Sequence, residues 1–563
     1  MSQQYENPAI QKAHDRVFKE GRTAHPGPIY PPGFTKDGFD DMIEELKSII
    51  GGENVHTGET LLHFSDPFSR RVNNLPSAAV CPETTDQVCG ILALANRLRF
   101  PLWTTSKGKN LGYGGPAPRV GGSVVLSLYR MKRILEVNEK AAFAVVEPGV
   151  SFFDLYEHCR THKLAVWPSM PAIAWGSVLG NALDRGFGYT AFGDHQNHIC
   201  GMEVLLPDGQ LIRTGQWAAD NAPSAFACKA SFGPQVDGLF LQSNLGVVTK
   251  LGIWMQPQPE ATMTVRLEMD KIEDLADLIE ILAKLRLEDI INNDPSIFNV
   301  FRRISRLAPR HELYSGPGAM PESLVADLMK KHNLPYWTTW FSFYGSKEIV
   351  QSRLAITQKT INDTNPGARL AYKLCQGEDG ARIDAEAIPK EWQPGNAGVP
   401  TINFATTIDY NTPPGGIGGH VDFSPILPYD GQLALKWFKA ATAVCNRHGF
   451  DSFIGGHAFA RHATLVHMIL FNRLDEQHVQ SATALWHELA SVAKEHGLVN
   501  YRTHLDYMDI VQDTYDFNDN AYRRFVETLK DSLDPNGILA PGKSGIWPKA
   551  YRDLKDERGN YKN

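Results

Sequence analysis

Residues 104–118, TTSKGKNLGYGGPAP, combine four glycines with side chains that can bind an anion. The stretch follows an apolar segment and contains Ser106, Lys107 and Asn110. Glycine lets backbone N–H groups approach an anion closely, and consecutive N–H groups in such a turn form an anion-binding concavity. The spacing fits neither the Walker loop nor the GxGxxG dinucleotide fingerprint. The stretch therefore predicts either a pyrophosphate-binding loop of another type or an ordinary glycine-rich connection between strands.

A second glycine-rich stretch covers residues 176–195, GSVLGNALDRGFGYTAFGDH. Five glycines recur there within twenty residues, so we expect the backbone to pass close to a flat or charged group. From about residue 259 the sequence pattern changes, because strand-like runs then alternate with helix-like runs. This change predicts a separate α+β lobe over residues 259–499.

The elements that must position these loops can be read from periodicity and capping. Residues 39–50 have helical spacing and end at two glycines, and a helix with a Thr/Asp cap is expected after a strand near residue 80. Residues 152–163 predict an amphipathic helix, and residues 475–497 predict the helix that closes the second lobe. Asp208 and Gly209 predict the tip of a hairpin.

Composition is ordinary for a globular enzyme and excludes several classes of function. The 563 residues are 42% hydrophobic and 21% charged, and the net charge of −7 argues against a general nucleic-acid binder. No run of 18 apolar residues predicts a membrane span, and the first residues lack the apolar core of a signal peptide. Seven cysteines without metal-ligand spacing predict reduced thiols and no metal site. We therefore expect a cytoplasmic protein.

Several short stretches, taken together and in order, resemble the vanillyl-alcohol oxidase / p-cresol methylhydroxylase flavoprotein family. They span roughly residues 77 to 548, and the resemblance favours the subgroup that acts on para-substituted phenols. The stretches are GYGGPAPRV, GSVVL, EVN, VVEPGV, GSVLGN, RGFGYT, FGDH, GMEV, GLFLQSNLGVVTKLGIWMQP, NYRTHL and DPNGILAPGKSGIWP.

The resemblance implies an α+β, two-lobed FAD-binding PCMH-type fold with an α+β cap domain. Residues 1–258 would form the FAD-binding domain, with its core at 73–258, residues 259–499 the cap, and residues 500–563 a return to the FAD-binding domain. The first glycine loop would hold the FAD pyrophosphate, and residues 176–195 would run along the cofactor. Lys543 would contact the flavin or pin the C-terminal segment. The implied cofactor contacts are Thr105, Ser106, Lys107, Gly108, Lys109, Asn110, Leu111, Gly112, Gly176, Ser177, Gly180, Asn181, Tyr189, Gly193, Asp194, His195, Gly246, Val248 and Lys543.

The same resemblance implies that Tyr113, Tyr501 and Arg502 bind the substrate as a phenolate. A para-substituted phenol has a pKa of about 10, and an arginine that stays charged would stabilise its anion. The ionised oxygen favours hydride loss from the benzylic carbon to flavin N5, giving a para-quinone methide that water can attack. Reoxidation by O2 would release hydrogen peroxide. The alternative is that Tyr113 packs in its loop, Tyr501 lies in the core and Arg502 forms a surface ion pair.

The sequence departs from the family pattern at two points. Ala172 stands where the oxidases of the subgroup carry an aspartate that assists as a base, and an alanine transfers no proton. Thr464 and Leu465 occupy the positions where the oxidases of the subgroup have a pair of histidines, one of which binds the flavin covalently. Ile408, expected on another cap strand, occupies the position where other members have a tyrosine that forms the covalent bond. His462, Tyr410 and His467 lie near these points, with His467 expected on the strand face of Leu465. We predict non-covalent FAD and interpret His457, His462 and His467 as ordinary strand histidines.

Three functions remain open at this stage. The chain is either an oxidase of para-substituted phenols that uses O2, a dehydrogenase or hydroxylase that passes electrons to another protein, or a catalytically weakened flavin-binding protein. The resemblance also implies a homodimer or a larger homo-oligomer.

Overall fold

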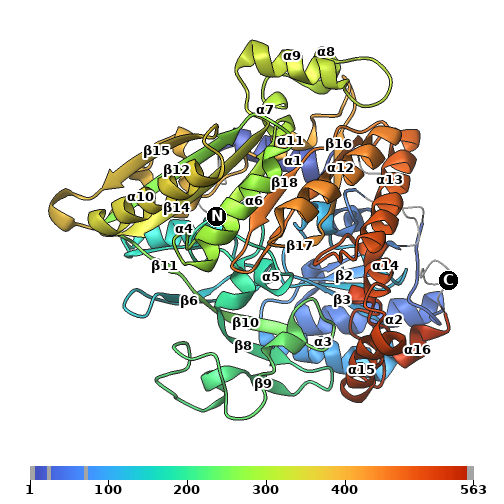
Figure 1. The fold of residues 1–563 in the computed structure, drawn as a ribbon. Helices are drawn as coiled ribbons and strands as arrows, with labels where there is room; N and C mark the ends of the chain where they lie inside the picture. The colour runs from blue at the N-terminus through green and yellow to red at the C-terminus, as the bar shows by residue number, and fades with distance from the viewer. Residues whose placement is uncertain (1–6, 22–26, 69–73, 555–563) are drawn as a thin grey trace.

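The computed structural model describes residues 7–21, 27–68 and 74–554. Two lobes are visible, with the β-sheets of the first half of the chain in the lower part of the view and the cap helices and strands above them (Figure 1). The N-terminal lobe contains a four-stranded sheet of order β1-β2-β4-β3 and a five-stranded sheet of order β5-β6-β10-β8-β9. The first sheet consists of β1 Val55–His56, β2 Ala78–Val80, β3 Leu102–Thr105 and β4 Val124–Ser127. The second consists of β5 Ile134–Asn138, β6 Phe143–Val146, β8 Ile199–Leu205, β9 Leu211–Arg213 and β10 Val247–Trp254.

A βαβ unit places the glycine loop at one edge of the first sheet. β2 and β3 both pair with β4 in parallel, and α3 (Thr85–Leu98) connects β2 to β3. The Thr84 side chain accepts a hydrogen bond from the Gln87 amide and so starts this helix, as the sequence predicts. Because β3 ends at Thr105, the loop leaves from the carboxyl end of a parallel strand, where α/β sheets commonly bind ligands.

The second lobe is built on a seven-stranded antiparallel sheet of order β15-β12-β14-β13-β18-β19-β17. The strands are β12 Ala261–Met269, β13 Ser296–Asn299, β14 Trp337–Gly345, β15 Arg369–Gln376, β17 Ile426–Pro428, β18 Gly455–Ala458 and β19 His462–Thr464. A separate pair, β16 (Gly418–Phe423) and β20 (His467–Asn472), is antiparallel and buried throughout. Helices α6 (Asp274–Leu287) and α12 (Gly431–Arg447) contact each other and contribute Leu278, Leu282 and Trp437 to the core.

The C-terminal segment returns to the N-terminal lobe, where α14 to α16 lie near α2 in Figure 1. The Leu102 amide donates to the Ile538 carbonyl over 2.7 Å, and the Ala540 amide donates to the Leu102 carbonyl over 2.7 Å. Ile538 and Leu539 join the hydrophobic cluster under α2 and α3. The return therefore extends the edge of the sheet that carries the glycine loop.

The remaining elements complete the shell around the two lobes. The longer helices are α1 Pro8–Phe18, α2 Lys36–Ile50, α4 Phe152–Thr161, α5 Val178–Leu183, α9 Glu322–His332, α10 Lys347–Thr364, α13 Glu476–Glu495 and α15 Phe517–Leu533. The short ones are α7 Phe301–Ile304, α8 Arg310–Leu313, α11 Ala405–Ile408, α14 Met508–Gln512 and α16 Lys549–Arg552. Strands β7 (Val166–Trp167) and β11 (Gln256–Pro257) form a two-stranded pair.

Most predicted elements are confirmed, and two local predictions are wrong. β8 and β9 form the expected antiparallel hairpin around Asp208 and Gly209. However, β19 ends at Thr464 and β20 begins at His467, so His467 does not share a strand face with Leu465. Ile408 ends the short helix α11 rather than lying on a strand.

Two further features bear on function. All seven cysteines are unpaired. In the described part of the chain no helix is long and apolar enough to cross a membrane, and no group of three or more His, Cys, Asp or Glu side chains is placed to hold a metal ion.

Candidate active site

A cavity of about 360 Å³ lies where the glycine loop, the second glycine stretch, the cap and the C-terminal return meet. This cavity is called the pocket below. Fourteen of the predicted cofactor residues line it: Thr105, Ser106, Gly108, Lys109, Asn110, Leu111, Gly176, Ser177, Gly180, Asn181, Tyr189, Gly246, Val248 and Lys543. Two segments that are far apart in the sequence, 104–115 and 176–189, therefore form adjoining walls of one cavity.

The glycine loop contains backbone conformations and close contacts that residues with a side chain rarely adopt. Gly108 has φ +63° and Gly114 has φ +109°, in the left-handed region that favours glycine. At Gly112 a Cβ atom would lie 2.5 Å from His420 Nε2 and 2.6 Å from Asp422 Oδ2 on β16. The loop is thus pressed against the cap, which explains a glycine at position 112 without a direct role in lining the pocket.

The other predicted cofactor residues, Lys107, Gly112, Gly193, Asp194 and His195, do not line the pocket. Lys107 Nζ lies 3.5 Å from the Gly149 carbonyl oxygen. His195 Nδ1 is 2.6 Å from Asn181 Oδ1, so this imidazole supports a pocket residue rather than lining the cavity itself. The Asn197 side chain donates to Asp194, and the Gly193 amide donates to Thr190 in the same turn.

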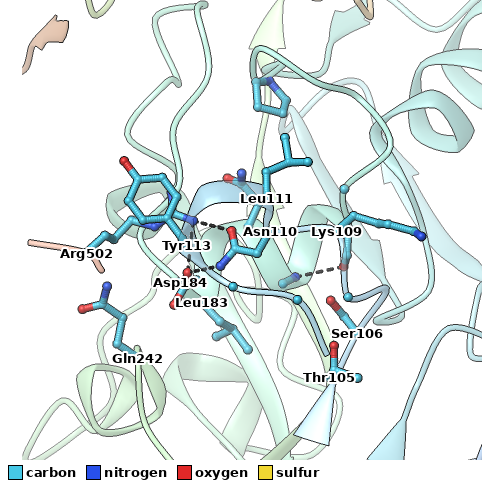
Figure 2. Close-up of a pocket in the computed structure, with 18 of the residues that line it drawn as sticks. Thr105, Ser106, Lys109, Asn110, Leu111, Tyr113, Leu183, Asp184, Gln242 and Arg502 are labelled. Carbon is cyan, nitrogen blue, oxygen red and sulfur yellow. Dashed lines mark hydrogen bonds and ion pairs between the residues drawn. The ribbon is translucent and has the colours of Figure 1, made fainter. Parts of the chain in front are cut away.

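Tyr113 and Arg502 stack against each other at one side of the pocket, as Figure 2 shows. The Arg502 guanidinium carbon lies 3.9 Å from the centre of the Tyr113 ring, and Arg502 is only 7% exposed. The Tyr113 hydroxyl lies 2.7 Å from Ser424 Oγ, and the Tyr501 amide donates to the Ser424 carbonyl over 3.2 Å. Ser424 therefore ties the two tyrosines together, and Arg502 forms no surface ion pair.

A carboxylate that the sequence analysis did not single out holds this arrangement in place. Asp184 accepts from Arg502 NH2 over 3.0 Å and lies 3.4 Å from Lys543 Nζ, and Asn110 joins both Asp184 and Arg502 (Figure 2). Although burial acts to raise the pKa of Asp184, Lys543 and Arg502 lower it below its usual value. One ionised carboxylate is thus shared between two cations, Arg502 and Lys543, and Asp422 is a further carboxylate that acts on Tyr113.

Both tyrosines are neutral hydrogen-bond donors at neutral pH. Burial raises the pKa of Tyr113 well above its usual value, and Tyr501 and Asp422 raise it further. Burial also raises the pKa of Tyr501, although Arg502 and Tyr113 act in the opposite direction. Asp184 and the two tyrosines outweigh the burial of Arg502 and raise its pKa. A charged guanidinium therefore lies beside two neutral tyrosines, of which Tyr113 lines the pocket and Tyr501 does not.

The cap wall contains groups that sequence reasoning missed or interpreted otherwise. His420 and Asp422 on β16 line the pocket, with His420 Nε2 3.0 Å from Asp422 Oδ2. His457 on β18 also lines the pocket, and burial lowers its pKa to about 3. The sequence signal that could have identified His420 was the alternation of side chains along a strand that contains a Gly-Gly-His run. Ala172 also lines the pocket and offers no carboxylate, whereas Asp422 is a carboxylate that lines it.

The residues expected near a flavin link lie elsewhere. The Thr464 hydroxyl donates to the Pro425 carbonyl over 2.9 Å, and Leu465 is fully buried. His467 Nε2 accepts a hydrogen bond from Trp437 Nε1 over 3.0 Å inside the cap core. The Tyr410 hydroxyl donates to Asp451, and the His462 ring stacks on Phe459.

The pocket fits a bound FAD on the observations of this structure. Gly176 lines the cavity, and a Cβ atom there would meet no atom within 4 Å, so the backbone borders open space that a flat group can approach. Arg502 Nε and His420 Nδ1 are buried and have no hydrogen-bond partner among the described residues. Backbone amides of the glycine loop suit a pyrophosphate.

The chain is similar to known flavoproteins over almost its whole length. It matches the FAD binding domain over residues 76–215 and the C-terminal domain of FAD linked oxidases over residues 427–544. These matches define an FAD-linked oxidoreductase.

Three relatives show how far the similarity extends. The 4-cresol dehydrogenase (hydroxylating) flavoprotein subunit of Pseudomonas putida is 28% identical over 523 residues, which are 92% of this chain and 98% of that protein. The 1'-carboxy-chondrochloren decarboxylase of Chondromyces crocatus is 27% identical over 539 residues, 90% of this chain and 98% of that protein. The 4-ethylphenol oxidase of Gulosibacter chungangensis, solved with isoeugenol, is 31% identical with a TM-score of 0.86, covering 93% of this chain and 100% of that one. The chain belongs to the PCMH-type family of FAD-binding flavoproteins.

Proposed function

We propose that the protein oxidises para-substituted phenols, which it binds as phenolates beside the flavin. The observation that carries this proposal is the buried Arg502 guanidinium stacked on Tyr113, with Asp184 shared between Arg502 and Lys543. An isolated buried positive charge is costly, so a cavity with this balance favours an anionic ligand. The names of two relatives, a 4-cresol dehydrogenase subunit and a 4-ethylphenol oxidase, support the same substrate class.

The residues act mainly on the charge of the substrate ring oxygen. Tyr113 and Tyr501 donate their hydroxyl hydrogens to that oxygen, since their raised pKa values keep them protonated. Arg502 offsets the negative charge and so favours the ionised phenol, whose usual pKa is about 10. FAD, when bound, supplies the acceptor for the benzylic hydride. Loss of that hydride from the phenolate leaves a neutral para-quinone methide, to which water adds to give a benzylic alcohol.

We propose O2 as the final electron acceptor, with H2O2 as its two-electron, two-proton product. A protein acceptor is the alternative, and it is favoured by Ala172, which lines the pocket where the oxidases of the subgroup carry an aspartate. The 4-cresol dehydrogenase relative, which is named as a flavoprotein subunit, also supports it.

The test is flavin reduction by 4-ethylphenol under anaerobic conditions, followed by addition of air. We expect bleaching of the visible flavin absorption with the phenol, then rapid recovery and one H2O2 for each phenol oxidised. Reduction followed by recovery only with an artificial one-electron acceptor would support the dehydrogenase. A protein that holds FAD but is not reduced by any para-substituted phenol would contradict both, and would leave the weakened flavin-binding protein.

Two properties accompany this proposal. We predict that FAD is held without a covalent bond, although His420 and His457 both line the pocket. Acid precipitation should therefore release the yellow colour into the supernatant, and colour retained in the pellet would contradict it. We also propose a homodimer or larger homo-oligomer, which light scattering after gel filtration measures directly.

A further inference from the structure

Arg302 brings a second guanidinium into the pocket from the cap. It lies in α7, directly after β13, and lines the pocket together with Phe298 and Phe404. Its NH1 group donates to the Thr407 hydroxyl, and its guanidinium carbon lies 5.8 Å from the centre of the Phe298 ring. Both contacts are uncharged, so neither compensates the positive charge of Arg302.

Several other arginines of the cap have carboxylate partners, although Arg306 forms no ion pair among the described residues. Arg286 lies 2.9 Å from Asp294, Arg303 lies 3.2 Å from Glu268, and Arg310 lies 2.8 Å from Asp451. Within the described ranges, by contrast, no carboxylate oxygen lies within 4.0 Å of the Arg302 guanidinium. The charged groups that act on Arg302 are Arg306, which repels it, and Tyr189, which has an ionisable hydroxyl.

Burial and the nearby Arg306 lower the pKa of Arg302 to about 10, so the guanidinium remains charged at neutral pH. Tyr189 also lines the pocket, and burial raises its pKa to about 12 although Arg302 acts in the opposite direction. The charged guanidinium of Arg302 and the neutral hydroxyl of Tyr189 are thus close together in the same pocket. A planar carboxylate matches this pair of donors.

We infer that Arg302 and Tyr189 recognise a carboxylate on the para side chain of the substrate. This inference rests on the proposed function, because the ring oxygen occupies the Arg502 end and leaves the side chain for the cap. The substrate class becomes 4-hydroxyphenyl alkanoic acids rather than neutral 4-alkylphenols. A ligand carboxylate would give this partly buried guanidinium a charged partner among the phenylalanines that surround it.

The experiment compares 3-(4-hydroxyphenyl)propanoate with its amide, which has the same shape and no charge. The half-saturating concentration for anaerobic flavin reduction is measured in the holoenzyme and in Arg302→Met, Arg302→Lys and Arg306→Met. We expect the wild-type protein to prefer the acid by about tenfold or more, Arg302→Met to lose this preference, and Arg302→Lys to keep part of it. Arg306→Met removes a like charge one turn away, outside the pocket, and should leave the preference unchanged.

Three results would overturn the inference. The first is equal half-saturation by the acid and the amide in the wild-type protein. The second is an equal rise of the half-saturating concentration for the acid and the amide in Arg302→Met. The third is release of FAD from that variant, measured by flavin fluorescence. Either of these two results would assign Arg302 to cofactor binding or to the stability of the fold. If no phenol reduces the flavin, the proposed function fails separately. Perturbation of the oxidised flavin spectrum by the acid, lost in Arg302→Met, would then still support the carboxylate site, and no perturbation would contradict it.

Discussion

At the scale of single residues, the site is organised by the sharing of one carboxylate. Asp184 is shared between two cations, Arg502 and Lys543, and a phenolate bound beside Arg502 would give this guanidinium a second anionic partner. The sequence alone could not show this, because Asp184 and Arg502 are 318 positions apart. Tyr113, Tyr501 and Arg502 could be proposed from local motifs, whereas Ser424 and Asp184 join them only because the fold brings distant segments together.

Removal of the anion-binding groups should impair binding and turnover together. In Tyr501→Phe we expect kcat/KM for 4-ethylphenol to fall about tenfold, because one hydrogen bond to an ionised oxygen is lost. In Arg502→Ala the fall should be about a hundredfold or more, since Asp184 then faces the phenolate with only Lys543 to offset it. Steady-state kinetics measure both. An unchanged kcat/KM in the two variants would place phenolate binding elsewhere.

Position 172 tests how water reaches the oxidised substrate. Ala172 lines the pocket without a proton-transfer group, and Ala172→Asp supplies one. With 4-ethylphenol we expect a larger proportion of 1-(4-hydroxyphenyl)ethanol relative to 4-vinylphenol, measured by chromatography of the products. Ala172→Asn has nearly the same shape and is the control. If Asp and Asn give the same product ratio, a base at this position does not govern hydration.

At the scale of elements, the glycine loop and the second glycine stretch both line the pocket, and their contacts with FAD stay a prediction. Their signal is local, because glycines mark backbone that must approach another group. The cap was less predictable. His467 was expected beside Leu465 on a strand, but the chain turns between β19 and β20 and directs His467 to Trp437. Residues two apart share a face only while the strand is unbroken. A two-residue break between strands leaves no clear signal in the sequence.

A substitution at Gly176 tests the proposed FAD-binding site without disturbing the fold. A Cβ atom at this position meets no protein atom within 4 Å, and φ there is open to alanine. Gly176→Ala should therefore fold normally but bind FAD about tenfold more weakly, because the methyl group occupies space that the cofactor needs. Titration of apoprotein with FAD, followed by flavin fluorescence, measures the Kd. Gly52→Ala, in an exposed turn, is the matched control, and equal affinities in both variants would remove Gly176 from the cofactor site.

At the scale of the whole molecule, two lobes and a returning C-terminal segment enclose the pocket, and burial sets the protonation of its surroundings. Three buried imidazoles are held neutral, because burial lowers the pKa values of His195, His457 and His467 from 6.5 to about 3. The overall architecture could be predicted, because the family motifs recur in order along the chain. The protonation states could not, because they depend on which side chains the fold excludes from water.

Acid should destabilise the folded protein well above the pKa of ordinary carboxylates. Between about pH 6.5 and pH 3 the unfolded chain protonates these three histidines and the folded chain does not, so stability falls as pH falls. Each imidazole contributes about 1.4 kcal/mol per pH unit in this window. Burial raises the pKa of Asp294 to about 7, which acts in the opposite direction and cancels one of the three.

The thermal unfolding midpoint of the holoenzyme should therefore decrease from pH 6.5 to pH 4.5. His467→Gln removes one titrating group from the cap core and should make the decrease shallower, while the exposed His332→Gln should leave it unaltered. An unfolding midpoint that stays level, or rises, over this range would show that the buried imidazoles are not held neutral.

The most direct test of the phenolate site compares 4-ethylphenol with 4-ethylanisole under anaerobic conditions. The two differ in one methyl group on the ring oxygen, which prevents ionisation while the benzylic C–H bonds remain. Rapid mixing with the oxidised holoenzyme follows the visible flavin absorption. We predict flavin reduction by the phenol and none by the ether, with the phenol rate greatly decreased in Arg502→Ala. Reduction by the ether at a similar rate would contradict the binding of an ionised ring oxygen.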